Sequence, residues 1–140
     1  QLRGGGVGVG AFWREVFEAG QMDLAPRYLT EAYIQHNPMV PSGRDAFVTF
    51  FSRIKKPAPV EAAVKAGLVA ITAERDLVVL SFVRELPDPK DATRTYTTTW
   101  FDMFRIENGK IAEHWDHVAK SKAALKFDPN VETKEKKPAK

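Results

Sequence analysis

The stretch TYTTTWFDMFRIENGKIAEHWDHV, from Thr95 to Val118, decides the fold of this chain. Threonine, aromatic and β-branched residues dominate its first half, which ends near Ile106, and these residue types favour β-strands. Asn108 and Gly109 follow, and both tolerate a positive φ angle at little cost, which favours a tight turn. A second run with strand character begins at Ile111. The stretch therefore predicts one long β-hairpin.

The form of the turn decides which side chains of this hairpin share a face. A two-residue type I′ turn would pair Asp102 with Trp115, whereas a three-residue loop with a bulge at Gly109 would pair Asp102 with His114. The glutamate and asparagine before Gly109 favour the bulged form, because they suit a type I turn. One face then carries Trp100, Asp102, Phe104, His114 and Asp116. The opposite face carries Thr97, Thr99, Phe101, Met103, Ile111, Glu113 and Trp115.

Upstream of the hairpin, the hydrophobic pattern predicts helices and then further strands. Apolar residues at helical spacing indicate helices, and alternating apolar residues indicate half-buried strands. Helices that precede a run of antiparallel strands are typical of an α+β fold. The expected elements are helices at 11–19, 23–29 and 42–54 and strands at 32–37, 60–71 and 77–86.

The two ends of the chain differ in composition from its middle. Residues 1–10 include five glycines, and no strand can precede a phosphate-binding loop there, so a flexible leader is predicted. Residues 126–140 are rich in lysine and are predicted to form a disordered basic tail. The residues between these ends, 11–125, are predicted to form a single α+β domain.

Composition also argues against several classes of function. The net charge of +3 arises from residues 120–140, which contain seven lysines and three acidic residues, so the near-neutral remainder gives no support for nucleic-acid binding. No apolar run approaches the length that spans a bilayer, so no membrane partner is expected. Cysteine is absent, which removes disulfides and thiolate metal ligands. With no readable signal peptide, a cytoplasmic protein is predicted.

Two motifs resemble a known family. They are the segment Tyr33-Ile34-Gln35-His36-Asn37-Pro38, followed by Ser42-Gly43-Arg44, and the segment 101–116, FDMFRIENGKIAEHWD. Over roughly residues 12–118 the chain resembles the SnoaL-like branch of the nuclear-transport-factor-2-like superfamily. The resemblance implies a cone, in which a strongly curved, mostly antiparallel sheet wraps around N-terminal helices and encloses a pocket. The resembled proteins include polyketide cyclases, which catalyse an aldol condensation, as well as isomerases, dehydratases and non-catalytic modules.

The resemblance further implies acid–base chemistry without a cofactor or a metal. By motif, Asp116 matches the general base that removes a proton next to a carbonyl group. Asp102 lies where the cyclases carry a histidine, so the histidine of this site is expected to be His36 or His114. Two carboxyl groups in one apolar pocket repel each other, so one is expected to hold a proton and act as an acid. The predicted catalytic residues are Asp116, Asp102 and His36.

The expected ligand is a small hydrophobic carbonyl compound, which would be cyclised, isomerised or dehydrated. The outer face of the hairpin is too apolar to remain wet on a monomer, and it predicts a homodimer packed through that face. The alternative function is a non-catalytic binding or dimerisation module, because this fold alone does not specify an activity. The predicted substrate-binding residues are Tyr33, Met39, Trp100, Phe104 and His114.

Plainer explanations also exist for the polar residues. His36 could hydrogen-bond to the backbone in the core, and Asp102 could form an ion pair with Arg94 or Arg105. A metal site has suitable ligand types available, but their spacing matches no metal-binding motif. Those ligands would be His36, His114 and Asp116.

Overall fold

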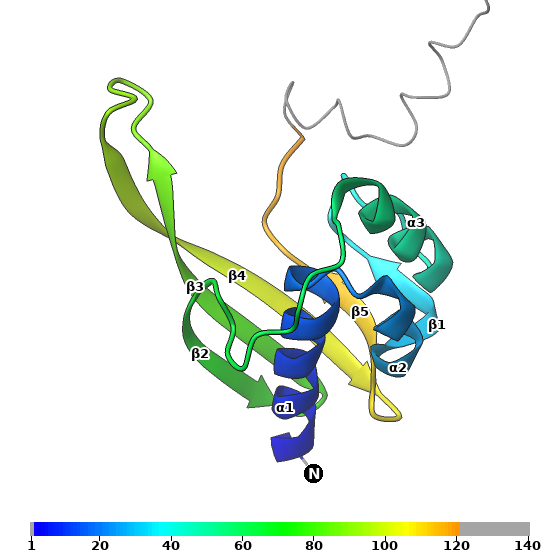
Figure 1. Cartoon of the computed structure of the whole chain (residues 1–140). Helices are drawn as coiled ribbons and strands as arrows, with labels where there is room; N and C mark the ends of the chain where they lie inside the picture. The colour runs from blue at the N-terminus through cyan, green and yellow to red at the C-terminus, as the bar shows by residue number, and fades with distance from the viewer. Residues whose placement is uncertain (1, 121–140) are drawn as a thin grey trace, which may run out of the picture.

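The structure, a computed structural model, describes residues 2–120 (Figure 1). The α+β class predicted from the sequence is confirmed, whereas the predicted basic tail lies outside the described residues. In chain order the elements are α1 (Leu2–Phe12), a π-helical segment (Trp13–Glu18), a 3-10 helix (Met22–Leu24), α2 (Ala25–Tyr28), β1 (Leu29–Gln35), α3 (Arg44–Ile54), β2 (Gly67–Glu74), β3 (Leu77–Pro87), β4 (Thr95–Glu107) and β5 (Lys110–Trp115).

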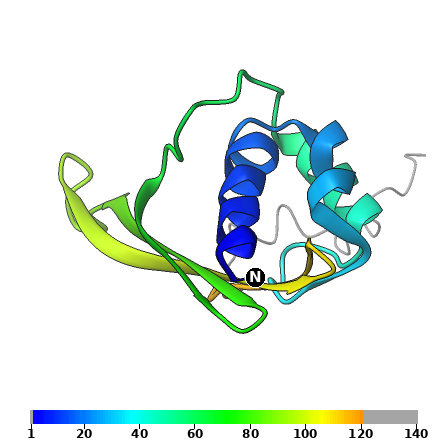
Figure 2. The same ribbon diagram turned by 90° about the horizontal axis from the view of Figure 1, so that it is seen from below.

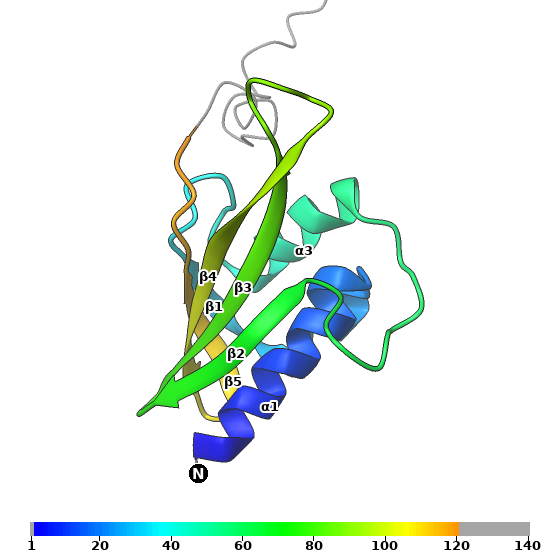
Figure 3. The same ribbon diagram turned by 90° about the vertical axis from the view of Figure 1, so that its left-hand side faces the viewer.

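The strands form one mixed sheet in the order β1-β5-β4-β3-β2. β1 runs parallel to β5 and every other neighbouring pair is antiparallel, so the sheet is mostly antiparallel as predicted. The long chain between β1 and β5 permits the parallel pairing, which no tight turn could make. All the helices lie on one side of the sheet, as Figures 2 and 3 show. None of the helices within residues 2–120 has the length and apolar character needed to cross a bilayer.

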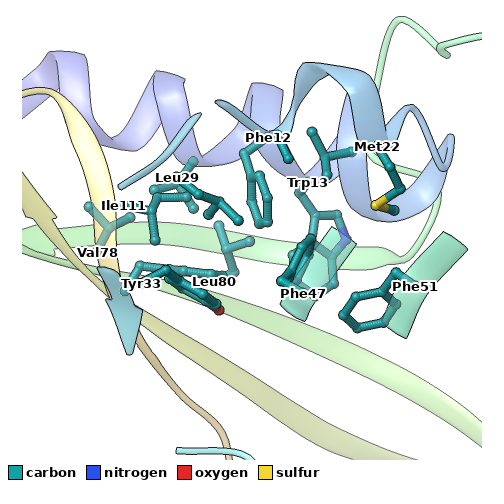
Figure 4. Packing of buried hydrophobic residues seen from close by; sticks show 14 of the residues in the cluster. Phe12, Trp13, Met22, Leu29, Tyr33, Phe47, Phe51, Val78, Leu80 and Ile111 are labelled. Atoms are coloured by element: carbon teal, nitrogen blue, oxygen red, sulfur yellow. The ribbon is translucent and has the colours of Figure 1, made fainter. Parts of the chain in front are cut away.

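The core lies between this inner face of the sheet and the helices. Alternate side chains in the first half of β3 are buried there, namely Val78, Leu80 and Phe82. The ring of Phe12 packs edge-on against Phe104 of β4, with ring centroids 6.0 Å apart. Figure 4 shows the aromatic side chains of the helices gathered over the strands. The alternation read from the sequence therefore identifies the face that the helices cover.

The predicted flexible leader at residues 1–10 is wrong, because Leu2–Phe12 forms α1. Glycine is a poor helix former, but tertiary packing overrides propensity here. Val9 is fully buried. A Cβ atom added at Gly6 or Gly10 would lie 3.4–3.5 Å from the side chain of Ile71 on β2. The glycines thus allow α1 to lie close to the sheet.

A pair of substitutions in α1 tests this packing. Gly8→Ala is expected to raise the free energy of unfolding by about 0.5–1 kcal/mol, because alanine favours the helix and nothing lies within 4 Å of the added Cβ. Val9→Ala is expected to lower it by about 2 kcal/mol, because buried methyl groups are removed and a cavity remains. Urea unfolding of the two variants measures both effects. A leader without structure would leave both values unchanged.

The predicted strand at 60–71 is only partly right, because β2 begins at Gly67. Residues 55–66 form an irregular connection from α3, which runs outside the sheet in Figure 3. The pairing of β2 with β3 begins where Gly67 lies opposite Val83. A Cβ atom at Gly67 would lie 2.9 Å from the carbonyl oxygen of Val83. Glycine, which has no Cβ atom, therefore allows β2 to approach β3 this closely at its first residue.

Candidate functional site

A cavity of about 350 Å³ lies between the inner face of the sheet and the helices. Half of its lining residues are aromatic, and a smaller number are polar. The aromatic residues are Phe12, Trp13, Phe17, Tyr33, Phe47, Phe50, Phe51, Phe82, Trp100 and Phe104. Besides the tyrosine, the polar residues of the lining are Glu18, Gln35, Asn37, Arg84, Asp102, His114 and Asp116.

The β4–β5 hairpin carries much of this wall, and its turn differs from the predicted one. Asn108 and Gly109 have φ angles of 50° and 77°, and two consecutive positive values are typical of a two-residue type I′ turn. The irregularity lies within the strands instead, where β5 has one extra residue, Ala112, between the partners of Ile106 and Arg105. The three-residue loop is therefore wrong, because the shorter turn matches the twist of the strands.

This bulge sets the pairs that follow it. Phe104 lies opposite His114, so the predicted pairing of Asp102 with His114 is wrong. The predicted inner face is nevertheless correct, because the bulge moves the side chains of β5 by one position, as the longer loop would have done. Its members Trp100, Asp102, Phe104, His114 and Asp116 all line the cavity. Ile111 is buried rather than on the outer face, because it precedes the bulge.

Asp102 and His114 form a buried pair in the cavity wall, with exposed fractions of 3% and 6%. His114 Nε2 lies 2.7 Å from Asp102 Oδ1. Trp100 Nε1 donates to the other carboxylate oxygen at 3.0 Å. The alternative ion pair with Arg105 is wrong, because Arg105 Nε donates to Glu113 at 2.8 Å. The two oxygens of Asp102 are thus both occupied by inward-facing partners.

Gln35 fixes the proton on the other nitrogen of His114. The backbone N–H of Asn37 donates to Gln35 Oε1 at 3.0 Å, which identifies this atom as the amide oxygen. His114 Nδ1 lies 2.6 Å from the same oxygen and therefore carries a proton. The amide nitrogen of Gln35 donates to the Tyr33 hydroxyl at 3.1 Å. One hydrogen-bonded chain therefore runs from Asp102 through His114 and Gln35 to Tyr33.

Asp116 lies beside this chain at the end of β5. Asn37 Nδ2 donates to its Oδ2 at 2.8 Å, and the backbone N–H of Val118 donates to its Oδ1 at 3.0 Å. Its Oδ2 lies 4.0 Å from His114 Nε2. Both direct donors to Asp116 are neutral, whereas Asp102 is bonded to the imidazole. The two carboxylates therefore differ in their surroundings, as two carboxyl groups with different tasks require.

Tyr33 supplies a hydroxyl that stays protonated. Burial raises the pKa of its phenol far above the ordinary value, and the negative charges of Asp102 and Asp116 raise the pKa further. Its oxygen accepts the hydrogen bond from Gln35, while its own proton has no acceptor within the part of the chain that the structure describes. A ligand oxygen in the cavity could accept this proton.

The prediction that His36 shares the cavity is wrong. Its ring stacks on Trp115 with centroids 4.8 Å apart, and its Nε2 lies 2.7 Å from Glu113 Oε1 on the outer face. Hydrogen bonds with His36 and then Arg105 lower the pKa of the Glu113 carboxyl. His36 faces outward because side chains alternate along an extended chain, and Gln35 takes the inward position.

Met39 is also displaced from the predicted site. It is buried, but it does not line the cavity described above. Gln35 and Asn37, which the sequence analysis did not single out, lie there instead. The two-residue period of a strand could have identified them. If Tyr33 faces inward, residues 35 and 37 are expected to face inward as well.

Asp102, His114 and Asp116 also have the composition of a metal site, since one ligand atom from each lies within 4.8 Å of the others. The set differs from the predicted alternative, in which His36 took the place of Asp102. Each oxygen of the two carboxylates and each nitrogen of His114 already has a hydrogen-bond partner in the protein. No orphaned atom among these three residues calls for an ion, and chemistry without metal or cofactor remains a prediction.

Comparisons with known proteins concern the family and the fold of the chain. A family model described as a SnoaL-like domain matches residues 9–114. No curated protein matches the chain. The solved structures of similar fold include a candidate polyketide cyclase from Xanthomonas campestris pv. campestris, with a TM-score of 0.57, 19% identity and coverage of 84% of this chain and 92% of that chain.

Two further solved structures have similar folds. A candidate SnoaL-like polyketide cyclase from Jannaschia sp. has a TM-score of 0.56 and 14% identity, and the match covers 91% of this chain and 92% of that one. An LEH-like epoxide hydrolase from M. tuberculosis has a TM-score of 0.59 and 12% identity, with 91% and 83% covered. At these identities the likeness shows the fold alone.

Proposed function

Because the chain belongs to the SnoaL-like domain family, we propose that its cavity is the ligand pocket of a cone-shaped fold and a site of acid–base catalysis. The observation that supports this most is the place of Asp116, a carboxylate on the wall of a largely aromatic cavity, 4.0 Å from His114 Nε2. Such a carboxylate can remove a proton from a carbon acid where little water competes. The substrate proposed is a hydrophobic carbonyl compound, and no cofactor takes part.

Asp116 is the proposed general base. One of its oxygens takes the proton from the carbon next to the carbonyl group, and the electron pair moves onto the carbonyl oxygen to form an enolate. The Tyr33 hydroxyl donates a hydrogen bond to that oxygen. In an aldol cyclisation the enolate carbon attacks a second carbonyl carbon of the same molecule, and Asp116 returns its proton to the new alkoxide. Isomerisation would return the proton to another carbon. In a dehydration, Asp116 would give its proton to the β-hydroxyl group, which leaves as water.

Asp102 and His114 are proposed to position the reacting groups. His114 Nε2 faces the carboxyl group of Asp102 and lies near that of Asp116, so the polar imidazole ring is held beside the base. Its Nδ1–H orients Gln35, which in turn orients the Tyr33 hydroxyl. The buried chain therefore links the base side of the cavity with the donor for the enolate oxygen. We therefore propose His114, rather than His36, as the histidine that positions the reacting groups.

The second candidate is a non-catalytic binding module. One specific observation favours it: every polar atom of Asp102, His114 and Asp116 already has a partner, as a purely structural network would. Such a module would bind an apolar ligand in the same cavity and leave it unchanged. The two functions differ in whether a bound ketone exchanges hydrogen with water.

The test is an exchange experiment in D₂O on a panel of ketones and polyketide-like diketones, followed by NMR. Under the proposal at least one ketone that binds in the cavity loses its α-hydrogen to solvent deuterium faster than in buffer alone. An epoxide belongs in the panel, since one protein of similar fold is an epoxide hydrolase. Binding without exchange or conversion of any compound would favour the module.

We also propose a homodimer formed through the outer face of the sheet. Phe101 and Val83 project from this face with exposed fractions of 49% and 44%, and apolar side chains gathered on one face mark contact sites. Sedimentation at micromolar concentration should show a species of twice the 15.7 kDa chain mass. Phe101→Glu should shift it to the monomer, because a charge at the centre of an interface is costly. A wild-type sample that remains at 15.7 kDa would contradict the dimer.

A further inference from the structure

The charged side chains that line the cavity differ in whether they have a hydrogen-bond or ion-pair partner in the protein. Glu18 accepts hydrogen bonds from the backbone N–H groups of Lys65 and Ala66. Asp102 and Asp116 accept from inward-facing partners, as described above. Arg84 also lines the cavity, but no carboxylate lies within ion-pair distance of it among the residues at 2–120. Arg84 is exposed, so its cation lies where the cavity opens to solvent.

The guanidinium of Arg84 has a defined place in spite of its exposure. It lies 4.5 Å from the centroid of the Trp100 ring, in a cation–π contact. The same indole ring donates its N–H to Asp102. The ring of Trp100 therefore separates the cation at the opening from the buried carboxylates.

The strand register gives the distance between these groups. Asp102 lies opposite Leu80 in the sheet, and Arg84 is four residues further along β3. At a rise of about 3.3 Å per residue, the two positions are about 13 Å apart along the strand. The side chain of Arg84 folds back over Trp100 and shortens the gap. A ligand of two or three fused rings could span it.

We propose that Arg84 binds an anionic group of the ligand at the opening of the cavity, so that the substrate is an amphipathic carbonyl acid. The apolar part of this ligand lies among the aromatic side chains, with its reacting carbon near Asp116. Its carboxylate meets the guanidinium, whose planar fork suits bidentate binding. This inference deepens the proposed function and rests on the cavity being the ligand site. The carboxylate of the proposed base, Asp116, would repel an anion bound beside it, which disfavours the opposite orientation.

The experiment uses calorimetric titration with 2-naphthoate and its neutral isostere 2-naphthamide. Wild-type protein should bind naphthoate more tightly than naphthamide, by about five-fold at low salt, the size of an ion pair at a part-exposed site. Arg84→Gln should remove this preference, with no loss of naphthamide binding. Arg84→Lys should retain part of it, because the charge remains but the planar contacts are lost. The matched control is Arg75→Gln, which removes the same charge from the β2–β3 turn outside the cavity lining and should keep the preference.

The outcomes separate this inference from the function on which it rests. A preference for naphthoate that survives Arg84→Gln, or a wild-type preference for naphthamide, would overturn the role of Arg84. Failure of both probes to bind would overturn the cavity as a ligand site, and the inference with it. Anion binding that depends on Arg84 supports the inference even if no compound shows α-hydrogen exchange, since the titration needs no turnover.

Discussion

Replacing Asp116 by asparagine is expected to slow α-hydrogen exchange of a bound ketone by about 10²–10⁴-fold, the usual contribution of a positioned general base. The amide has almost the same shape as the carboxylate but cannot take up the proton. Ligand affinity should change little, because the aromatic wall of the cavity is untouched. The loss should therefore appear in kcat rather than in KM.

The stability of this variant should be nearly unchanged. Asparagine can still accept the backbone hydrogen bond of Val118, while the bond from Asn37 is lost at a cost of about 1 kcal/mol. The loss of a desolvated charge offsets part of this cost. A matched control is Glu113→Gln, a carboxylate of β5 on the outer face, which should retain exchange activity. Equal loss of exchange in both variants would contradict the assignment of the base to Asp116.

The second large effect concerns stability rather than rate. Asp102→Leu is expected to lower the free energy of unfolding by about 3 kcal/mol, because it leaves the buried His114 Nε2 and the part-buried Trp100 Nε1 without their hydrogen-bond partner. Breaking one side of a buried pair costs more than replacing both sides by apolar groups. Denaturant unfolding monitored by circular dichroism measures the change.

A double variant separates the pair from its surroundings. Adding His114→Phe to Asp102→Leu should recover part of the stability lost in the single variant, because two apolar side chains then face each other. The double-mutant cycle should give a coupling energy above about 1 kcal/mol. Costs that simply add would contradict a direct interaction between Asp102 and His114 and would leave both as independent core residues.

The class of the fold and the inner face of the hairpin could be predicted from the sequence, because both follow from short-range periodicity. The alternation of side chains from Trp100 to Asp116 identifies the face that lines the site. The result is the same whether the one extra residue of the hairpin lies in the turn or in β5. The exact pairing could not be predicted, because the position of the bulge at Ala112 depends on how β5 packs in the core. The helix at the glycine-rich start could not be predicted for a related reason. Burial of Val9 stabilises this helix, and that burial depends on contact with the rest of the fold.

The candidate site was predicted in part. Residue type favours His36 as a site residue, but the same alternation that places Tyr33 inward turns His36 outward. Gln35 and Asn37 carry neutral amides, a residue type that by itself indicates no site, although their hydrogen bonds orient His114 and Asp116. Burial of the Asp102–His114 pair depends on contacts between strands far apart in sequence, which no local pattern contains.

The proposed role of Asp116 is that of a base toward a carbon acid in this cavity. It is tested most directly by measuring deuterium exchange at the α-carbon of one bound ketone, side by side for wild-type protein and Asp116→Asn. We expect exchange above the buffer rate in the wild type and at least a 100-fold loss in the variant. Exchange at equal rates in the two proteins, or no exchange of any ketone that titrates into the cavity, would contradict it.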